Sequence, residues 1–302
     1  MTKKRGFGIG SIYYGIGYGF SRADISSVYI EMAEDGTTTA YSGTCDMGQG
    51  VMTIVAQVAA EVIGIHADMV RVASADTSST PDAGATSASR STFVQSVAVQ
   101  EAAEDLRDQL LKMAADILHS SKEELEAHNG EIYRMGKKAP LISVAEVAAE
   151  IHRQGKRCAS WGWHENATQD VDPETSQGDA WATYGWATQL VEVEVDTETG
   201  HVQVTKIVSA TDAGKALNPL AVEGQMQGGA TMGLGYALYE QHILDQGIPQ
   251  TGSLAFYLVP SSMDVPEIEC EIVEVHDPKG PLGAKGIAEP AMIPTPAAIL
   301  NA

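Results

Sequence analysis

The stretch SVYIEMAEDGTTTAYSGTCDMGQGVMTIVAQVAAEVI, residues 27–63, indicates the kind of fold to expect. Its first part alternates apolar and polar residues on either side of Asp35-Gly36, a dipeptide that favours a tight hairpin turn. Its last part, Met52 to Ile63, repeats apolar residues at helical spacing and stops at a glycine. Asp46 to Gly50 joins the two parts, so the sequence predicts a strand pair that leads through a glycine turn into a helix.

Further helices and strands follow this stretch. Met69 to Ala73 alternates as a short strand, and Ser91 to His119 carries a long helical pattern. Two Ser-x-x-Glu segments have the spacing of capping boxes and predict two shorter helices, with a hairpin-like excursion between them: Ser121 with Glu124, Ser143 with Glu146, and Gly130 to Gly136.

The second half repeats the strand-pair pattern. Gln189 to Asp196 and His201 to Val208 alternate on either side of a turn, which predicts a second hairpin. Asn218 to Glu240 has glycines at helix-compatible spacing, so we expect a helix packed closely against another backbone. Pro294 to Ala302 is a helical pattern without a Gly or Pro terminator, and we expect that helix to continue in the native protein. These elements together predict an α+β fold.

The tryptophans indicate where the chain divides. All four lie close together in the sequence, beside Pro173 and several acidic residues: Trp161, Trp163, Trp181 and Trp186. This composition is typical of a connection packed onto a surface. We therefore expect a first subdomain over residues 1–160, a Trp-rich connection over 161–188 and a second subdomain over 189–302.

Charge and composition exclude several classes of protein. The 302 residues contain 19 Lys and Arg against 40 Asp and Glu, a net charge of −21, which offers no basic face for nucleic acid. The apolar content of 44% is enough for a real core. Apolar runs are too short to span a membrane, and the segment after Met1 is not a signal core, so we expect a soluble, cytoplasmic protein. The three cysteines are too far apart for a disulfide framework or a cysteine-only metal site.

Common catalytic signatures are absent from the sequence. It contains no GxGxxG, GxSxG, HExxH or EF-hand loop, and the loop that begins at Gly84 lacks the lysine of a phosphate-binding P-loop. The eight histidines show no metal-ligand spacing, and we expect no metal ligand from this chain.

Loops rich in glycine, hydroxyls and glutamine are the more informative signal. Gly48, Gln49 and Gly50 precede a helix, where free backbone N–H groups can hold an anion; a plain strand-to-helix turn is the alternative. The segment Gly84 to Ser91 offers hydroxyls and N–H donors that can wrap a phosphate-bearing ligand, with Arg90 adding charge; a helix cap is the alternative. Gln225 is an amide in an apolar segment and needs a polar partner.

Glu289 is the strongest candidate for a catalytic residue. It follows the apolar stretch Gly286-Ile287-Ala288 and precedes Pro290. A carboxylate in such a water-poor setting is expected to have a raised pKa, as a general base requires. A structural role at a helix start is the alternative interpretation.

In this order along the chain, the quoted motifs resemble those of the molybdenum hydroxylases of the xanthine oxidase/dehydrogenase family. They comprise Asp46 to Gly50, Gly84 to Ser89, Val195-Asp196 with Thr199-Gly200, Asp212 to Gly214 with Asn218-Pro219, Glu223 to Gln225, and Gly283 to Pro290. The resemblance covers the second half of the family's molybdopterin-binding region. It implies mixed α/β subdomains of the aldehyde oxidase/xanthine dehydrogenase type, in a medium molybdopterin subunit of a split enzyme such as bacterial nicotinate dehydrogenase.

The resemblance also implies a cofactor and the residues that bind it. The cofactor is molybdopterin with molybdenum, expected in the cytosine dinucleotide form. The positions that match cofactor-contacting segments are Gly48, Gln49, Gly50, Thr86, Ser87, Ala88, Ser89, Arg90, Ser91, Gln225, Lys285 and Gly286. Tyr13, Tyr14 and Tyr18 match a segment that carries an aromatic ring against the substrate, with Tyr18 or Tyr13 as first choice.

Glu289 matches the family's catalytic glutamate. The role this implies is to take a proton from a molybdenum-bound hydroxyl, while hydride passes to a sulfido or selenido ligand and water-derived oxygen enters the substrate. The expected substrate is a nitrogen heteroaromatic such as nicotinate, with a purine such as xanthine as next choice.

The same resemblance implies partner subunits and leaves alternatives open. A large molybdopterin subunit, an iron–sulfur subunit with 2Fe–2S clusters and an FAD subunit are the expected partners, without nucleic acid or membrane. One alternative is a non-catalytic subunit that only completes the cofactor cavity and the assembly interface. A more remote one is a nucleotide- or sugar-phosphate-binding enzyme that uses the same neutral loops.

Overall fold

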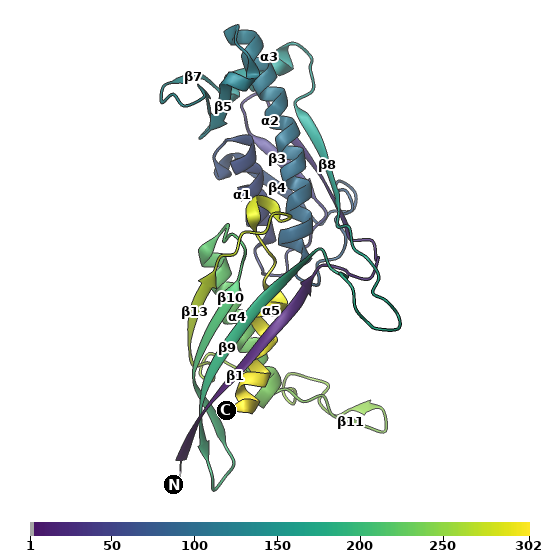
Figure 1. Ribbon diagram of the computed structural model, residues 1–302, viewed down its shortest axis with the longest axis vertical. Coiled ribbons are helices and arrows are strands. Elements are labelled where there is room, and N and C mark those ends of the chain that lie inside the picture. The colour runs from purple at the N-terminus through teal and green to yellow at the C-terminus, as the bar shows by residue number, and fades with distance from the viewer. Residues whose placement is uncertain (1–2) are drawn as a thin grey trace. The chain divides into compact units, whose positions relative to one another are not determined.

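The computed structural model describes residues 3–302, which form two compact units (Figure 1). Unit 1 contains the N-terminal strand up to Ile16, together with Thr183–Asp277 and Lys285–Ala302. Unit 2 contains Gly17–Ala182 and Pro278–Ala284. Strands and helices are mixed in both units, as the α+β prediction requires.

Unit 2 is built on a four-stranded sheet of order β4-β3-β2-β8. Its strands are β2 (Ile25–Met32), β3 (Thr38–Ser42), β4 (Val70–Ser74) and β8 (Ala159–Glu165). A smaller sheet consists of β5 (Leu125–His128), β6 (Glu131–Arg134) and β7 (Pro140–Ser143). The helices are α1 (Val51–Ile63), a π-helical turn Ser91–Gln95 that runs into α2 (Ser96–Leu118), and α3 (Val144–Arg153).

Local patterns predicted most of these elements. The β2–β3 hairpin, helix α1 with its left-handed Gly64 cap, and the Ser143–Glu146 capping box at the start of α3 are confirmed. The prediction of a helix that begins at Ser121 is wrong. Only the 3-10 turn Lys122–Glu124 forms there, because the Ser121 hydroxyl bonds to the Glu123 carboxylate and makes no cap on the backbone.

Unit 1 is built on a four-stranded sheet of order β1-β9-β10-β13. Its strands are β1 (Lys3–Ile16), β9 (Thr183–Asp196), β10 (Val202–Asp212) and β13 (Glu267–Val273), of which only the β10–β13 pair is parallel. The helices are α4 (Pro219–Leu238), α5 (Ala288–Met292) and α6 (Pro294–Asn301). A two-stranded arm, β11 (Leu244–Asp245) and β12 (Ile248–Pro249), follows α4.

Glycines let these helices lie directly on the sheet. A Cβ added at Gly6, Gly8 or Gly10 of β1 would lie between 2.0 and 2.3 Å from a carbonyl oxygen of α6 or its ends. A Cβ at Gly229 of α4 would lie 3.0 Å from the backbone of Ala291, which confirms the predicted close packing of this glycine-rich helix. Aliphatic side chains from β9, β10, α4 and α6 fill the core between the helices and the sheet.

The units differ from the predicted subdomains. Strand β1 belongs with the C-terminal half, because it pairs with β9 from Lys3 opposite Asp196 to Ile16 opposite Thr183. Residues 161–165 and 183–188 of the predicted Trp-rich connection are strand, whereas its longer middle part, residues 166–182, lies between β8 and β9 as a connection. Two of the tryptophans lie in β8 and one in β9, and only Trp181 lies between these strands. The pairing of β1 with β9 joins segments far apart in the sequence, so no local sequence pattern predicts it. The tryptophans are assigned to a loop from composition alone, which does not distinguish a loop from strand ends that carry exposed indole rings.

Candidate cofactor and catalytic site

Two of the predicted cofactor loops meet in unit 2 at a single backbone oxygen. The carbonyl of Cys45 accepts a hydrogen bond of 3.0 Å from Nε2 of Gln49 and another of 3.0 Å from Oγ1 of Thr86. The Gln49 side-chain oxygen also accepts from the N–H of Met47. The structure thus brings together the two loops that the sequence analysis singled out separately.

The N-terminus of α1 is arranged differently from the prediction. The Asp46 carboxylate accepts hydrogen bonds from the N–H groups of Gly48, Gly50 and Met52. Partial burial acts to raise the pKa of Asp46, but these N–H donors outweigh it and lower the pKa. The N-terminus of α1 therefore already binds a carboxylate of its own chain. From the sequence we expected these N–H groups to be available to a ligand phosphate, and in the structure they are occupied by Asp46.

The two glycines of this loop nevertheless leave space for a ligand. Gly48 and Gly50 have positive φ angles of 107° and 79°, and a Cβ added to either would have nothing within 4 Å. Gly48 and Gln49 lie at or near the surface. The backbone can therefore be approached closely from outside, which a side chain at these positions would prevent.

The Gly84 to Ser91 loop is held in an unusual backbone conformation. Ala88 and Ser89 both have φ near 52°, in the left-handed region that non-glycine residues rarely adopt. The carbonyl of Ala88 accepts from the N–H of Gly17 at 2.9 Å, and the Ser87 hydroxyl shares a hydrogen bond of 2.8 Å with the Tyr18 hydroxyl. Backbone strain that surrounding contacts maintain is characteristic of ligand-binding loops.

Arg90 does not face a ligand, contrary to the prediction. Its side chain is 2% exposed and forms an ion pair of 2.5 Å with Asp24, which is fully buried. The remaining guanidinium donors go to the carbonyls of Ala83, Ala85 and Ile25. Because every one of these partners belongs to the chain, Arg90 fixes the shape of the loop. Asp24 was missed by sequence reasoning, since nothing in the local pattern marks it as buried.

Glu289 lies in unit 1, in the first turn of α5, and its residue is partly exposed. Tyr14 of β1 lies close enough to Glu289 for the charge of Glu289 to affect its pKa. Burial of the phenol, with the negative charge of Glu289 as a second cause, raises the pKa of Tyr14 to about 12. Tyr14 therefore remains a neutral hydrogen-bonding phenol beside the carboxylate at any physiological pH.

Strand β9 positions the helix that carries Glu289. Gly185 lies opposite Tyr14 in the sheet, and a Cβ there would lie 3.1 Å from Cγ of Pro290. Four residues further along the same face of the strand, the fully buried Gln189 donates from Nε2 to the carbonyl of Ala291 at 2.7 Å. Neither residue was predicted as part of the site, because their roles depend on contacts with a distant segment.

Lys285 also has a role different from the one predicted. Its ammonium forms an ion pair of 2.7 Å with Asp212, and the two side chains are 9% and 7% exposed. The N–H of Lys285 bonds to the carbonyl of Ala213. Lys285 and the adjacent buried Gly286 thus anchor the segment that leads to Glu289, and the ammonium is committed to a partner within the chain.

The tyrosines divide between the two faces of β1 and the two units. Tyr13 is 53% exposed and lies on the face opposite to Tyr14, because neighbouring residues of a strand point to opposite sides. Its ring stacks on Tyr184 and lies against Trp186. Tyr18 belongs to unit 2, where the Arg22 guanidinium lies 4.0 Å from its ring centroid. Of the first-choice tyrosines, Tyr13 is therefore directed away from the Glu289 face.

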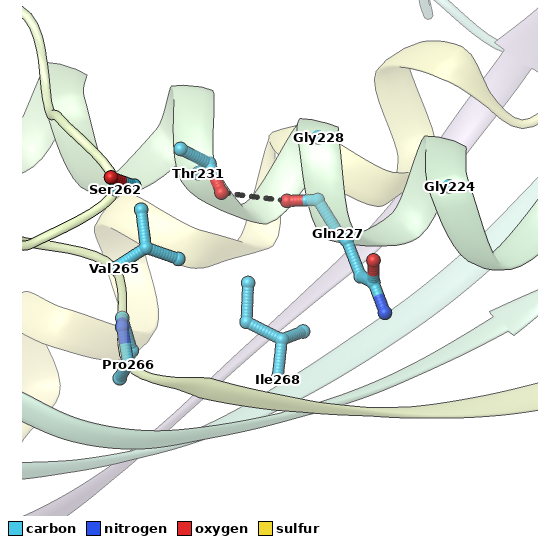
Figure 2. A pocket seen from close by; sticks show the side chains of 8 residues that line it. All are labelled: Gly224, Gln227, Gly228, Thr231, Ser262, Val265, Pro266 and Ile268. Carbon is cyan, nitrogen blue, oxygen red and sulfur yellow. Dashed lines mark hydrogen bonds between the residues drawn. The ribbon is translucent and has the colours of Figure 1, made fainter.

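Gln225 lies half-buried on α4, and it is not among the α4 residues that line an open hollow of about 530 Å³. Figure 2 shows this hollow between α4 and the segment that leads into β13, with Gln227, Thr231 and Ile268 among its lining residues. The Thr231 hydroxyl donates to the Gln227 carbonyl at 2.8 Å. Gln227, in the same apolar segment as Gln225, is exposed.

The described residues form neither a metal-ligand cluster nor a membrane-spanning helix. Residues 3–302 contain no group of three or more His, Cys, Asp and Glu side chains placed to hold a metal ion. Over the same residues, no helix has both the length and the apolar character needed to cross a membrane.

Comparisons with known proteins identify the family. Residues 1–266 match the family model of the molybdopterin cofactor-binding domain. The chain is 32% identical over 303 residues to the putative xanthine dehydrogenase molybdenum-binding subunit of Escherichia coli, an alignment that covers 99% of this chain. The chain belongs to the molybdenum hydroxylase family. The resemblance inferred from the ordered motifs is confirmed.

Other molybdenum hydroxylases agree in sequence and in fold. The nicotine 6-hydroxylase large subunit of Paenarthrobacter nicotinovorans is 32% identical over 279 residues, which are 90% of this chain and 33% of that subunit. The crystal structure of quinoline 2-oxidoreductase from Pseudomonas putida 86 superposes with a TM-score of 0.87 at 26% identity, over 99% of this chain and 38% of that one. The predicted fold type is thereby confirmed.

This molybdenum hydroxylase chain is much shorter than its relatives. It spans 39% of the length of the Escherichia coli subunit and 30% of the aldehyde oxidoreductase from Desulfovibrio gigas, whose structure superposes with a TM-score of 0.81 at 27% identity over 100% of this chain. It corresponds to a molybdopterin-binding part of these longer proteins.

Proposed function

We propose that this chain is a catalytic, molybdopterin-binding subunit of a multi-subunit hydroxylase that inserts water-derived oxygen into a nitrogen heteroaromatic, with Glu289 as general base. The observation that carries the proposal is the Tyr14–Glu289 pair on the sheet of unit 1. Glu289 is partly exposed near a phenol whose pKa is raised to about 12, so a carboxyl group, the type of group that serves as a general base, lies near a neutral hydroxyl.

The residues of unit 2 fit a large polar cofactor. Gln49, Thr86 and Ser87 offer amide and hydroxyl groups at a surface where Gly48 and Gly50 leave open space before the backbone. These neutral groups suit the pterin and phosphates of molybdopterin, proposed in its cytosine dinucleotide form. When bound, this cofactor supplies the two-electron oxidation and the oxygen that enters the substrate.

Several predicted residues act indirectly in this proposal. Arg90 shapes the Gly84 to Ser91 loop through Asp24, and Lys285 anchors the approach to Glu289 through Asp212. Gln189 and Gly185 hold α5 on the sheet, so the Glu289 carboxylate is presented from a supported helix turn. Catalytic groups held by packing and hydrogen bonds are ready for reaction without reorganisation.

Relatives support the substrate class. The names of three of them mention nicotine, quinoline and xanthine, each of which contains a planar nitrogen heteroaromatic ring, whereas others mention carbon monoxide and aldehydes. We propose nicotinate first and a purine second, with the ring packed by an aromatic side chain. Tyr14 replaces Tyr13 as the favoured residue within unit 1, because it shares the face of Glu289. Tyr18, bonded to Ser87, is the candidate within unit 2.

The rest of the assembly is also proposed. Relatives that are named as subunits of dehydrogenases and hydroxylases support a heteromeric complex. We propose a large molybdopterin subunit, an iron–sulfur subunit with 2Fe–2S clusters and an FAD subunit as partners. A cytoplasmic location completes the proposal.

Substitution of Glu289 by Gln tests the catalytic role. A general base contributes about 10²–10⁴-fold to the rate, so the purified Glu289→Gln complex should lose at least about 100-fold in substrate-dependent reduction of an artificial acceptor. Its molybdenum content should equal that of the wild-type complex. The substrates to assay are nicotinate, hypoxanthine, xanthine and simple aldehydes.

The control separates catalysis from cofactor binding. Thr86→Val removes a hydroxyl of the cofactor loop and should lower molybdenum content together with activity. Undiminished activity in Glu289→Gln, combined with loss in Thr86→Val, would support a non-catalytic subunit that only completes the cofactor cavity. Absence of molybdenum from the active wild-type complex would instead favour a nucleotide- or sugar-phosphate-binding enzyme.

A further inference from the structure

One face of the sheet in unit 1 remains open to solvent. Helices α4, α5 and α6 pack on the other face, where the glycines of β1 and the core valines of β9 point (Figure 1). Within residues 3–302, no helix of unit 1 covers the open face. Its side chains include large apolar ones with these exposed fractions: Phe7 65%, Ile9 58%, Tyr13 53%, Trp186 55% and Leu190 40%.

Strand register gathers these side chains into one strip. Ile9 lies opposite Leu190, and Tyr13 lies opposite Trp186, so their side chains are neighbours across the β1–β9 pair. The Tyr13 ring centroid lies 4.4 Å from that of Trp186. We name this strip, made of Phe7, Ile9, Tyr13, Trp186 and Leu190, the apolar strip. The Ser11–Thr188 pair, whose hydroxyls are hydrogen-bonded to each other at 2.9 Å, lies between these two apolar pairs on the same face. Exposed apolar side chains gathered on one face in this way are characteristic of interaction sites on soluble proteins.

An acidic row borders the apolar strip on the same face. In the sheet register Leu190 lies opposite Val208, which lies opposite Glu269 of β13. Glu267 and Glu271 flank Glu269 at the alternate positions of that strand, and all three are exposed. Within this row, Lys206 pairs with Glu269 at 2.7 Å. A partner that covers the face must therefore present an apolar centre and, on the β13 side, basic residues.

The lengths of the relatives indicate which partner has this chemistry. The chain spans 39% of the Escherichia coli molybdenum-binding subunit and 38% of the quinoline 2-oxidoreductase chain. The remaining part of those proteins is larger than the part that matches this chain. We propose that the large molybdopterin subunit of the assembly proposed above, which would correspond to that remaining part, docks on the apolar strip and meets the acidic row with lysines or arginines. This proposal rests on the multi-subunit arrangement proposed above.

Two charge substitutions at the centre of the strip test this docking. The chain is tagged in the organism that makes it, and the complex is purified with its partner identified by mass spectrometry as the missing part of the relatives. Leu190→Lys and Ile9→Lys place an ammonium in the apolar contact and should each lower partner recovery at least tenfold. Glu271→Lys should lower recovery through repulsion by the basic edge.

Matched controls separate docking from folding. Leu220 on α4 is 79% exposed and lies outside the apolar strip, so Leu220→Lys should leave recovery unchanged. Phe7→Ser, at 65% exposure, is a milder variant if a charged one fails to fold, as judged by circular dichroism. It should lower partner recovery several-fold.

Three outcomes overturn the proposal. The first is unchanged partner recovery in folded Leu190→Lys and Phe7→Ser variants. The second is recovery of a partner that belongs to a different class of protein. The third is a dimer of the wild-type chain, detected by sedimentation, that the Leu190→Lys substitution abolishes. Failure of the catalytic proposal can be told apart from failure of the docking proposal. The Glu289→Gln variant tests activity, and its partner recovery should equal that of the wild type whether or not activity is lost.

Discussion

Tyr14 reports on Glu289 at the scale of single residues. Its pKa is raised from 10.0 to about 12, by burial first and by the charge of Glu289 second. In the unfolded chain the phenol loses its proton near pH 10, whereas in the folded chain it keeps it to about pH 12. The folded state binds more protons between these values, so this contribution to stability is present below pH 10 and is lost as pH rises toward 12.

A spectrophotometric titration at alkaline pH checks this pairing. The tyrosinate absorbance of wild type minus that of Tyr14→Phe should rise with a midpoint near pH 12. Glu289→Gln removes the second cause and should move this midpoint toward 10, without reaching it, because burial remains. A midpoint that does not change in Glu289→Gln would show that the two side chains do not interact.

Single residues also show what the sequence cannot predict about a site. The motifs identified Arg90, Lys285 and Asp46 as residues of interest, but not the groups that they bind. The first two were expected to face the cofactor and instead pair with Asp24 and Asp212. Such partners come from other segments of the chain. A residue type at a position therefore predicts chemical capacity, while only the fold decides whether that capacity is used inside the protein or offered to a ligand.

Helix α4 provides a prediction at the scale of elements. A Cβ at Gly233 would lie 2.5 Å from Cβ of Thr295, whereas at Gly228 nothing lies within 4 Å. Gly233→Ala should overpack the contact with α6 and destabilise unit 1 by about 1–3 kcal/mol. Gly228→Ala should stabilise it by roughly 0.5–1 kcal/mol, because alanine restricts the unfolded chain. Urea unfolding of both variants checks the opposite signs, and equal effects would contradict the packing argument.

Local elements were the most predictable part of this fold. The start of helix α4 is predicted by Asn218-Pro219. The Asn218 side chain caps the helix, and the Pro219 ring fits its first turn. The β9–β10 hairpin follows from alternation across a Thr-Gly turn. The pairing of β1 with β9 was not predictable in the same way. These strands are separated in the sequence by all of the residues between Ile16 and Thr183, and pairing over such a distance depends on tertiary packing.

The charge of −21 constrains ligand binding at the scale of the whole molecule. A phosphate-bearing cofactor meets an acidic protein, so the proposed loops must bind it with neutral donors. The structure narrows these donors further than the sequence did. The N–H groups at the start of α1 are occupied by Asp46, and Arg90 is buried in its ion pair. The side chains of Gln49, Thr86 and Ser87 also bond within unit 2, so they would bind a ligand through their remaining hydrogen-bonding capacity or by exchanging these partners.

Each unit has a core of its own, which predicts separate unfolding. In unit 1, Ile207 is fully buried among residues of β9, β10, α4 and α6. In unit 2, Leu110 of α2 is fully buried, and most of that unit is the continuous segment Gly17–Ala182. Cooperative unfolding follows the core that a set of residues shares. We therefore expect two transitions when the chain is heated in a calorimeter.

Core substitutions assign these transitions to the units. Ile207→Ala and Leu110→Ala each remove a buried side chain and should cost about 2–5 kcal/mol. Ile207→Ala should lower the midpoint of only one transition, and Leu110→Ala that of only the other. Because unit 1 assembles from three chain segments and its β1–β9 pair joins distant residues, we expect its transition to refold more slowly after cooling. A single transition that both substitutions shift equally would mean that the two cores unfold as one.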